Sequence, residues 1–367
     1  MLSVPHGFQV RTDRGRVSLG AGASRTVRLA VKIPERLRPG YYDLLVRART
    51  SRGAILPALV IPLRITPHLH AILPLLYSMG NADNAVVAID PDNGALGPRI
   101  AVGNNPGAAV FGPRGRRLFV ANSGSNTLSV IDTRSQKVIA TLPTGQGPSA
   151  LVVDPGQSIL WVANGGSNNV EPFDLRTLKP GTPIATGAGP DALALGPHGS
   201  HLYVADGGTE DILPILAATR RAEAPIPVGG SPSALALSPN GHRLYVVESS
   251  RDLVVPLDLP HRRILPAIPA GLMPGTPTLS GSGRMLYVPD YATNQITPID
   301  TRLGRALRPM PAGVGPFDVV LGARGCSIYV SDGAGGTLLR IRRRSGRRVY
   351  RVRTVSLPVA IAGSWNR

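Results

Sequence analysis

The sequence has little cysteine and no long apolar segment. Cys326 is the only cysteine among 367 residues, which excludes a disulfide or a cysteine-based metal site within the chain. No stretch of 18 apolar residues occurs, and the most apolar segment, 54–63, contains two prolines, so we expect no membrane-spanning helix. The first eight residues carry neither the basic nor the apolar part of an export signal.

Lysine and aromatic residues are also scarce. Of 40 basic residues only three are lysine, aromatic residues make up 4%, and the formal net charge is +18. Such a charge fits a polyanionic partner such as nucleic acid. An arginine-rich composition inherited from a genome rich in G and C explains it equally well, and both explanations stay open.

One pattern recurs seven times at a fixed spacing of 42 residues. It contains a Leu/Ile–aromatic pair and, later in the unit, a proline. The pairs are Leu76-Tyr77, Leu118-Phe119, Leu160-Trp161, Leu202-Tyr203, Leu244-Tyr245, Leu286-Tyr287 and Ile328-Tyr329. The prolines are Pro106, Pro148, Pro190, Pro232, Pro274, Pro316 and Pro358. A repeat this regular predicts one structural unit per 42 residues.

Each unit has the pattern of four short strands. In one of them, 233–237, 244–247, 253–257 and 263–268 are apolar runs separated by turn residues. Four strands per unit predict a four-stranded blade, and seven units predict an all-β, seven-bladed β-propeller over 76–367. We expect 359–363 to supply the innermost strand of blade one, because the competing segment 65–69 contains a central proline. Removal of the last ten residues should then destabilise the ring.

The repeat resembles a known family. The segment Leu118 to Asn126, the run Val130 to Thr133 and the segment Gly145 to Pro148 are similar to the signature of YVTN-type propeller repeats, and 160–169 repeats it. The resemblance covers about residues 72–365. It implies a propeller like those of surface-layer, periplasmic and secreted proteins. Related-looking propellers include lactonases and a streptogramin lyase, so the fold is compatible with an enzyme.

Residues 1–66 do not follow the period. Alternating apolar residues in 27–33 and 42–48 predict two half-buried strands. The segments 17–22 and 34–42 resemble bacterial Ig-like modules, which implies a small, incomplete Ig-like β-sandwich followed by a linker at 67–75. We hypothesise that the natural start lies upstream and includes an export signal, which would place the protein at the cell surface, outside the cell or in the periplasm.

The strand order sorts the charged loops onto two faces. Loops between strands one and two, and between strands three and four, collect most arginines, which are densest in blade seven. A polyanion site there would use five of them, and the alternative is a solvated rim without aromatic side chains for base stacking. The polyanion candidates are Arg342, Arg343, Arg344, Arg347 and Arg348.

The opposite face collects acidic residues around the mouth of the ring. Asn122, Asn164, Asp206, Asp290 and Asp332 share one repeat position, where a short polar side chain caps a turn, so we interpret them as structural. Residues that break the repeat are better ligand-binding candidates. They are Glu210, Glu248, Arg251, Asp252, Tyr291, Phe317 and Asp318, with Asp191 as a weaker member.

Three functions fit these features. The first, which we prefer from the sequence, is a non-catalytic binding or scaffolding module for a protein or polysaccharide at the cell surface. The second is a lactonase- or lyase-like enzyme with a divalent metal at the acidic mouth, although that face offers no histidine for a lyase. The third is polyanion binding by the basic face. No other cofactor is expected, and a monomer is the default.

Overall fold

The computed structural model describes residues 2–3, 9–12, 29–32, 40–46, 59–65, 76–156, 158–322, 325–355 and 358–363. The chain divides into two units, Met1–His68 and Leu69–Arg367.

In the first unit the structure describes five strands. They are β1 (Leu2–Ser3), β2 (Gln9–Thr12), β3 (Leu29–Lys32), β4 (Gly40–Val46) and β5 (Leu59–Ile65). The order β1-β4-β5 forms one antiparallel sheet, and β2 pairs with β3 in another. The Ig-like module depends on residues between these strands, which lie outside the described part of the chain, as does the linker at 67–75. Both therefore stay predictions.

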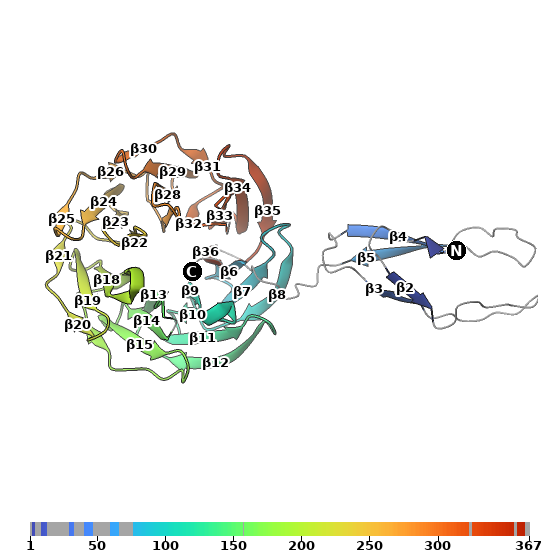
Figure 1. The fold of residues 1–367 in the computed structure, drawn as a ribbon, viewed down its shortest axis with the longest axis horizontal. Helices are drawn as coiled ribbons and strands as arrows, with labels where there is room; N and C mark the ends of the chain where they lie inside the picture. The colour runs from blue at the N-terminus through green and yellow to red at the C-terminus, as the bar shows by residue number, and fades with distance from the viewer. Residues whose placement is uncertain are drawn as a thin grey trace, which may run out of the picture. The chain divides into compact units, whose positions relative to one another are not determined.

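The second unit is a ring of seven antiparallel blades (Figure 1). Blade one contains β36 (Pro358–Gly363), β6 (Leu76–Gly80), β7 (Ala85–Ile89) and β8 (Leu96–Ala101). Blade two contains β9 (Pro106–Phe111), β10 (Arg117–Asn122), β11 (Thr127–Asp132) and β12 (Lys137–Pro143). Blade three contains β13 (Pro148–Val153), β14 (Ile159–Asn164), β15 (Asn169–Asp174) and β16 (Ile184–Ala185). Blade seven contains β32 (Pro316–Leu321), β33 (Ser327–Asp332), β34 (Thr337–Arg342) and β35 (Arg348–Arg353).

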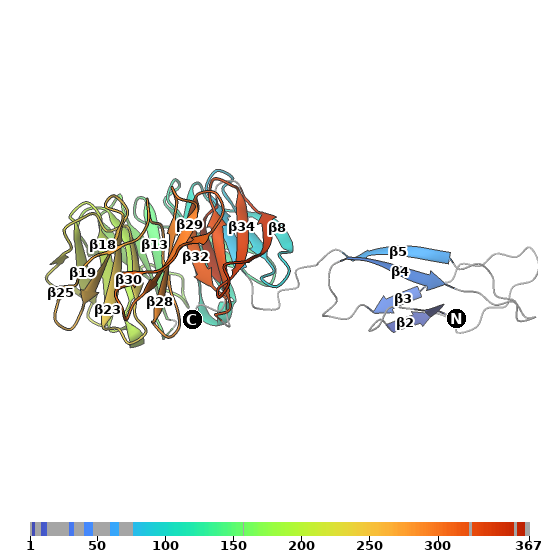
Figure 2. The ribbon, with the colours of Figure 1, turned by 90° about the horizontal axis from the view of Figure 1, so that it is seen from above.

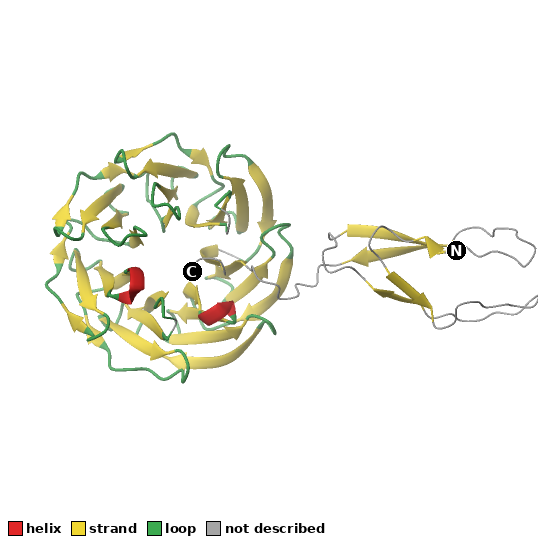
Figure 3. Cartoon of the chain, in the orientation of Figure 1, coloured by secondary structure: helices red, strands yellow, loops and turns green. Residues whose placement is uncertain are grey.

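In blades four to six the outer strand is split into two short pieces. Blade four contains β17 (Pro190–Leu195), β18 (His201–Asp206), β19 (Asp211–Leu216), β20 (Arg221–Ala222) and β21 (Ile226–Pro227). Blade five contains β22 (Ala234–Leu237), β23 (Arg243–Glu248), β24 (Leu253–Asp258), β25 (Arg263–Ile264) and β26 (Ile268–Pro269). Blade six contains β27 (Thr278–Leu279), β28 (Met285–Asp290), β29 (Gln295–Asp300), β30 (Arg305–Ala306) and β31 (Met310–Pro311). Two 3₁₀ turns, η1 (Pro113–Gly115) and η2 (Pro197–Gly199), complete the described elements of this unit (Figure 3).

The ends of the ring meet within one sheet. β36 pairs antiparallel with β6 from Pro358↔Gly80 to Gly363↔Leu76, so the last described strand is the inner strand of the first blade. This pairing leaves no open sheet edge between the two ends of the ring. Seen from the side, the strands run between two loop-bearing faces (Figure 2).

The core lies between the blades. Each pair of neighbouring blades shares one apolar cluster, and the seventh joins blade seven to blade one through Tyr329, Leu338, Leu76 and Ile361. The seven aromatic residues of the repeat are all buried, from Tyr77 at 0% to Tyr203 at 9% exposure. Their side chains therefore stabilise the packing of one blade on the next and do not form a ligand cage.

Candidate functional site

The acidic face is built from two kinds of loop that pair with each other. We call it the mouth face; it comprises the turns between strands two and three, and the loops that join consecutive blades. In blade two Gly124 N–H donates to Asn104 O at 3.0 Å, and in blade three Gly166 N–H donates to Gln146 O at 3.0 Å. These bonds hold each interblade loop against the turn of the blade that follows it.

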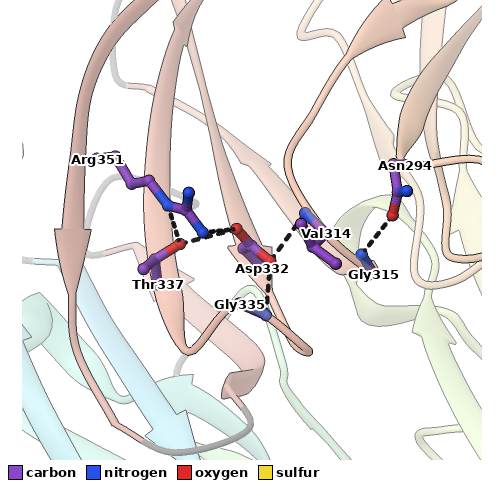
Figure 4. Close-up of polar contacts among 7 residues, drawn as sticks. All are labelled: Asn294, Val314, Gly315, Asp332, Gly335, Thr337 and Arg351. Carbon is purple, nitrogen blue, oxygen red and sulfur yellow. Dashed lines mark hydrogen bonds and ion pairs between the residues drawn. The ribbon is translucent and has the colours of Figure 1, made fainter.

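A second set of bonds ties each turn to the next interblade loop. Asn126, Asn168 and Asn294 adopt positive φ, and Oδ1 of each accepts a backbone N–H 21 residues later, as Asn294 does from Gly315 at 2.8 Å (Figure 4). These side chains cap the following interblade loop and not their own turn. Asp252 occupies the same repeat position and accepts Met273 N–H at 2.8 Å.

Three of the sequence candidates therefore fit the repeat and do not break it. Glu210 has the same left-handed conformation as Asp252 and the asparagines, with φ 59°. Glu248 lies 42 residues from Asp206 and from Asp290, at the end of the second strand. In the sequence these three residues look like breaks in the repeat, because their side chains differ in length or charge from the asparagine or aspartate that is usual at these positions.

Asp332, at the end of β33, is a carboxylate with donors on every side (Figure 4). Its Oδ1 accepts the N–H groups of Val314 and Gly335, both at 2.9 Å. Its Oδ2 accepts the Thr337 hydroxyl at 2.8 Å and the Arg351 guanidinium at 3.0 Å. This residue holds loops and strands of blade seven together, and the interpretation as a structural cap is sound for it.

Asp206 and Asp290 occupy the same position in blades four and six but lack such a set of donors. Oδ2 of Asp206 accepts Gly187 N–H at 3.1 Å, and Oδ2 of Asp290 accepts the Thr297 hydroxyl at 2.5 Å. Oδ1 of each is buried without a hydrogen-bond partner among the described residues. Burial raises the pKa of Asp206 to about 6 and that of Asp290 to about 7. The repeat pattern predicts turn capping for both residues and does not indicate their raised pKa values.

Asp191 is an open carboxylate at the mouth, and Glu210 on the same face is exposed too. It lies at the start of β17, is exposed, and has no hydrogen-bond or ion-pair partner in the described part of the chain. The equivalent residue of blade three, Ser149, donates to Pro190 O at 2.6 Å and so links two blades. Partial desolvation raises the pKa of Asp191, and its charge is one of the effects that raise the pKa of Asp206. Desolvation is the largest cause of the raised pKa of Asp206, and the charge of Asp211 contributes more to it than the charge of Asp191.

The Asp191 carboxyl lies close to Gly207. A Cβ atom at Gly207 would stand 2.7 Å from Oδ2 of Asp191. At Gly165, the same position of blade three, the nearest atoms to such a Cβ are 3.5 Å away. A side chain at position 207 would therefore have to displace the Asp191 carboxyl.

Glu248 and Arg251 form an ion pair within blade five. Nη1 of Arg251 donates to Oε2 of Glu248 at 2.9 Å and to Gly229 O at 2.6 Å. Burial raises the pKa of Glu248, and Arg251 opposes that effect. Both candidates are committed to this contact, which places them in the rim of the mouth as a pair.

Tyr291 and Phe317 are exposed, whereas Asp318 is buried between blades. Oδ2 of Asp318 accepts Ile361 N–H of the closing strand β36 at 2.8 Å, and the Ser331 hydroxyl accepts Asp318 N–H. Burial raises the pKa of Asp318 to about 7. Five of the seven blades have alanine at this position, so Asp318 is a departure from the repeat that lies at the ring closure.

The five arginine candidates for polyanion binding lie on one turn of the opposite face. Arg342 ends β34 and Arg348 begins β35, and Gly346 N–H donates to Arg342 O at 2.9 Å to close the turn. Arg340, in the same run, is structural: its guanidinium lies against the rings of Tyr329 and Tyr350 and donates to Pro91 O. Polyanion binding by the turn stays a prediction.

The described part of the chain lacks a group of metal ligands, and its hollow lies away from the mouth. No three Asp, Glu, His or Cys side chains among the described residues are grouped so that they could hold a metal ion. A hollow of about 350 Å³ is lined by Phe173, Lys179, Arg220 and neighbours, at the ends of β14 and β15 and in the loops that follow the third strands of blades three and four, away from the mouth. None of the described helices is long and apolar enough to cross a membrane.

Comparisons with known proteins support the fold. No protein-family model matches the chain, and no curated protein matches it, so the YVTN-type resemblance stays a prediction. Among solved structures it is similar to the periplasmic gluconolactonase of Pseudomonas aeruginosa, with 20% identity, a TM-score of 0.64, and 79% of this chain and 98% of that one covered. A candidate 6-phosphogluconolactonase from Bacteroides uniformis has 16% identity, a TM-score of 0.67, and coverage of 79% and 99%.

A third similar structure is the dihydro-heme d1 dehydrogenase NirN, with 20% identity, a TM-score of 0.61, and coverage of 84% of this chain and 68% of that one. Identities this low establish an all-β seven-bladed propeller with four-stranded blades and nothing finer. The preference for a non-catalytic binding or scaffolding module was nevertheless wrong. These neighbours carry the names of enzymes, and they favour the lactonase alternative.

Proposed function

We propose that this chain is a lactonase-like hydrolase that opens a cyclic ester at the mouth of the propeller. The observation that carries the proposal is the pair Asp191 and Asp206: an exposed carboxyl without a partner among the described residues, near a buried carboxyl whose pKa is raised to about 6. Pairs of carboxyls held in different environments are a common means of supplying a base and a proton store near neutral pH. Two similar structures named for lactonase activity support the same class of reaction.

The chemistry assigned to the pair is general-base hydrolysis. Ionised Asp191 accepts a proton from a water molecule while the water oxygen forms a bond to the lactone carbonyl carbon. The ring C–O bond then breaks, the proton passes to the leaving alkoxide oxygen, and a hydroxy acid is released. Asp206 does not touch the water in this scheme; below its pKa of about 6 it retains its proton and adds no second negative charge beside Asp191.

The metal-dependent version of the alternative has less support. The described residues provide no group of three ligands, so no step is assigned to a metal ion. A periplasmic or secreted location is part of the proposal, supported by the periplasmic origin of the gluconolactonase neighbour.

Substitution of Asp191 tests the proposal. Asp191→Ser restores the residue that blades three and five have at this position, so we expect the fold to tolerate it. Ring opening of glucono-δ-lactone and of neutral alkyl-substituted lactones, followed by pH-stat titration, should fall about 10²-fold or more, the range attributed to a general base. Asp252→Asn, which removes a nearby mouth charge and matches the asparagine of four other blades, is the control and should keep the rate.

A second variant displaces the same carboxyl without removing it. Gly207→Ala places a methyl group where Oδ2 of Asp191 lies, and we expect kcat/KM to fall roughly ten- to hundredfold. Gly165→Ala, at the same position of blade three, should leave it unchanged. A wild-type protein that opens none of these lactones faster than buffer, or an Asp191→Ser variant as active as wild type, would overturn the proposal.

A further inference from the structure

An exposed apolar patch lies on the mouth face across blades six and seven. Its members, which we call the apolar patch, are Leu272, Met273, Tyr291, Val314 and Phe317, with exposed fractions between 38% and 57%. All five belong to the interblade loops, the turn between strands two and three, or the first residues of an inner strand. Exposed apolar side chains gathered in this way mark a binding surface more often than scattered ones do.

The repeat does not require these side chains. Where blade six has Leu272 and Met273, blade two has Asn104 and Asn105 and blade three has Gln146 and Gly147. The positions equivalent to Tyr291 and Phe317 hold only serine or glycine in blades two and three. Blade two has Ser123 at the Tyr291 position and Gly107 at the Phe317 position. Blade three has Gly165 and Ser149 there. Folding therefore does not explain why five apolar residues gather here.

Backbone contacts make the patch one continuous surface. Tyr291 N–H donates to Met273 O at 3.2 Å, which holds the Tyr291 backbone beside the Leu272–Met273 loop. The ring also covers Gly315 of the next blade, where a Cβ atom would be 2.8 Å from Cε2 of Tyr291. Thr276 N–H donates to Phe317 O at 2.9 Å, so the inner strand of blade six lies against the Phe317 backbone.

The charge of the mouth face argues against an anionic ligand. Arg251 is the only cation in the interblade loops and in the turns between strands two and three, and it is already bonded to Glu248 and Gly229 O. The same face carries Asp191, Glu210 and Asp252. A phosphate or carboxylate on the ligand would meet these charges, and these loops and turns offer no free cation to bind it.

The apolar patch and Asp191 lie on opposite sides of the mouth. Asp191 and Phe317 follow the repeat proline of β17 and β32, and these inner strands belong to blades four and seven of a seven-bladed ring. They therefore lie on opposite sides of the mouth, as the places of β18 and β32 in Figure 1 indicate. We infer that the ligand is a neutral lactone with an apolar substituent that lies on the apolar patch, and not a phosphorylated sugar lactone. This inference rests on the proposed function for its reacting group only.

Binding of lactams, which copy the lactone ring but resist hydrolysis, separates this inference from the catalytic one. Isothermal titration calorimetry would compare δ-valerolactam, its octyl-substituted form below its micellar concentration, and a lactam with a phosphate group. We expect the octyl compound to bind at least tenfold more tightly than the unsubstituted one, and the phosphorylated compound to bind no more tightly than the unsubstituted one.

Residues from other blades provide variants that the fold accommodates. The triple variant Leu272→Asn, Met273→Asn and Phe317→Ser carries the residues of blades two and three, and asparagine suits the positive φ of 53° at Met273. We expect it to abolish the advantage of the octyl chain. Leu303→Ser removes an exposed leucine from the turn between strands three and four, on the opposite face, and should preserve that advantage.

The outcomes distinguish the two proposals. Lactone hydrolysis that is independent of the alkyl chain and unchanged in the triple variant would overturn the apolar-substituent inference and leave the hydrolase proposal standing. Chain-dependent lactam binding that the triple variant abolishes, without any lactone hydrolysis, would support the patch and overturn the hydrolase. Tighter binding of the phosphorylated lactam, or an equal loss in Leu303→Ser, would also overturn the patch.

Discussion

Asp290 and Asp332 occupy the same repeat position in neighbouring blades, and their surroundings differ. Asp332 accepts four hydrogen bonds, one of them from Arg351 on the outer strand β35. The residue equivalent to Arg351 in blade six is Pro309, which has no side-chain donor, and Asp290 keeps one partner, Thr297. The repeat thus fixes where a carboxyl lies, and residues outside the repeat decide whether it is stabilised as an anion.

Removal of the well-bonded carboxyl should have the largest effect. Asp332→Ala leaves the N–H groups of Val314 and Gly335 and the Thr337 hydroxyl without their acceptor. We expect the free energy of unfolding to fall by about 2–4 kcal/mol, measured by urea denaturation. Arg351 is half-exposed and can be hydrated, so it adds little to the loss.

A matched variant in blade six gives the contrast. Asp290→Ala removes a carboxyl with one partner and should cost clearly less than Asp332→Ala at pH 8. Equal losses in the two variants would show that the number of donors does not explain the difference between the blades.

Neutralising Asp290 should raise stability in a pH-dependent way. Its pKa is about 7 in the folded protein, above the ordinary value of 3.8, so the folded state retains a proton that the unfolded chain has lost. The contribution is fully present below pH 4 and is lost as the pH rises through 7. Asp290→Asn should match wild type near pH 4 and exceed it by about 1–3 kcal/mol above pH 8.

Thermal unfolding from pH 4 to 9 measures this difference. Asparagine can still accept the Thr297 hydroxyl, so the comparison isolates the charge. A stability difference that does not change with pH would mean that Asp290 is ionised at its ordinary value.

The sequence predicted the ring well because the 42-residue period is imposed by packing. Tyr77, Phe119 and Trp161 are buried between blades, and each must recur in register for the next blade to pack. The pattern also assigns 359–363 to the inner strand of blade one, where β36 pairs with β6. Such features repeat, so one sequence displays them seven times.

The state of the mouth carboxyls could not be predicted in the same way. Asp206, Asp290 and Asp332 look identical in the repeat, and only contacts from other strands separate them. The residues that break the pattern in the sequence differ in what they do in the structure. Asp252 accepts a backbone N–H, as asparagine does at that position in other blades. Asp191 stands where blade three has Ser149, which links two blades. Contacts between residues distant in sequence decide these cases, and a period of 42 contains no information about them.

The smallest effect on stability should come from a change at Asp252, whose charge acts on Asp290. Its carboxylate accepts Met273 N–H at 2.8 Å, and its charge is one of the causes of the raised pKa of Asp290. Asp252→Asn keeps an acceptor for Met273, so the free energy of unfolding should change by less than about 0.5 kcal/mol. Removal of the charge should lower the pKa of Asp290, because a like charge nearby disfavours its ionised form. Carboxyl ¹³C NMR titration of Asp290 measures that shift directly, with Glu223→Gln as a control that changes a carboxylate on the opposite face. A midpoint for Asp290 that is the same with and without the Asp252 charge would assign the raised pKa to burial alone, and the difference between blades six and seven would then depend only on the missing donors.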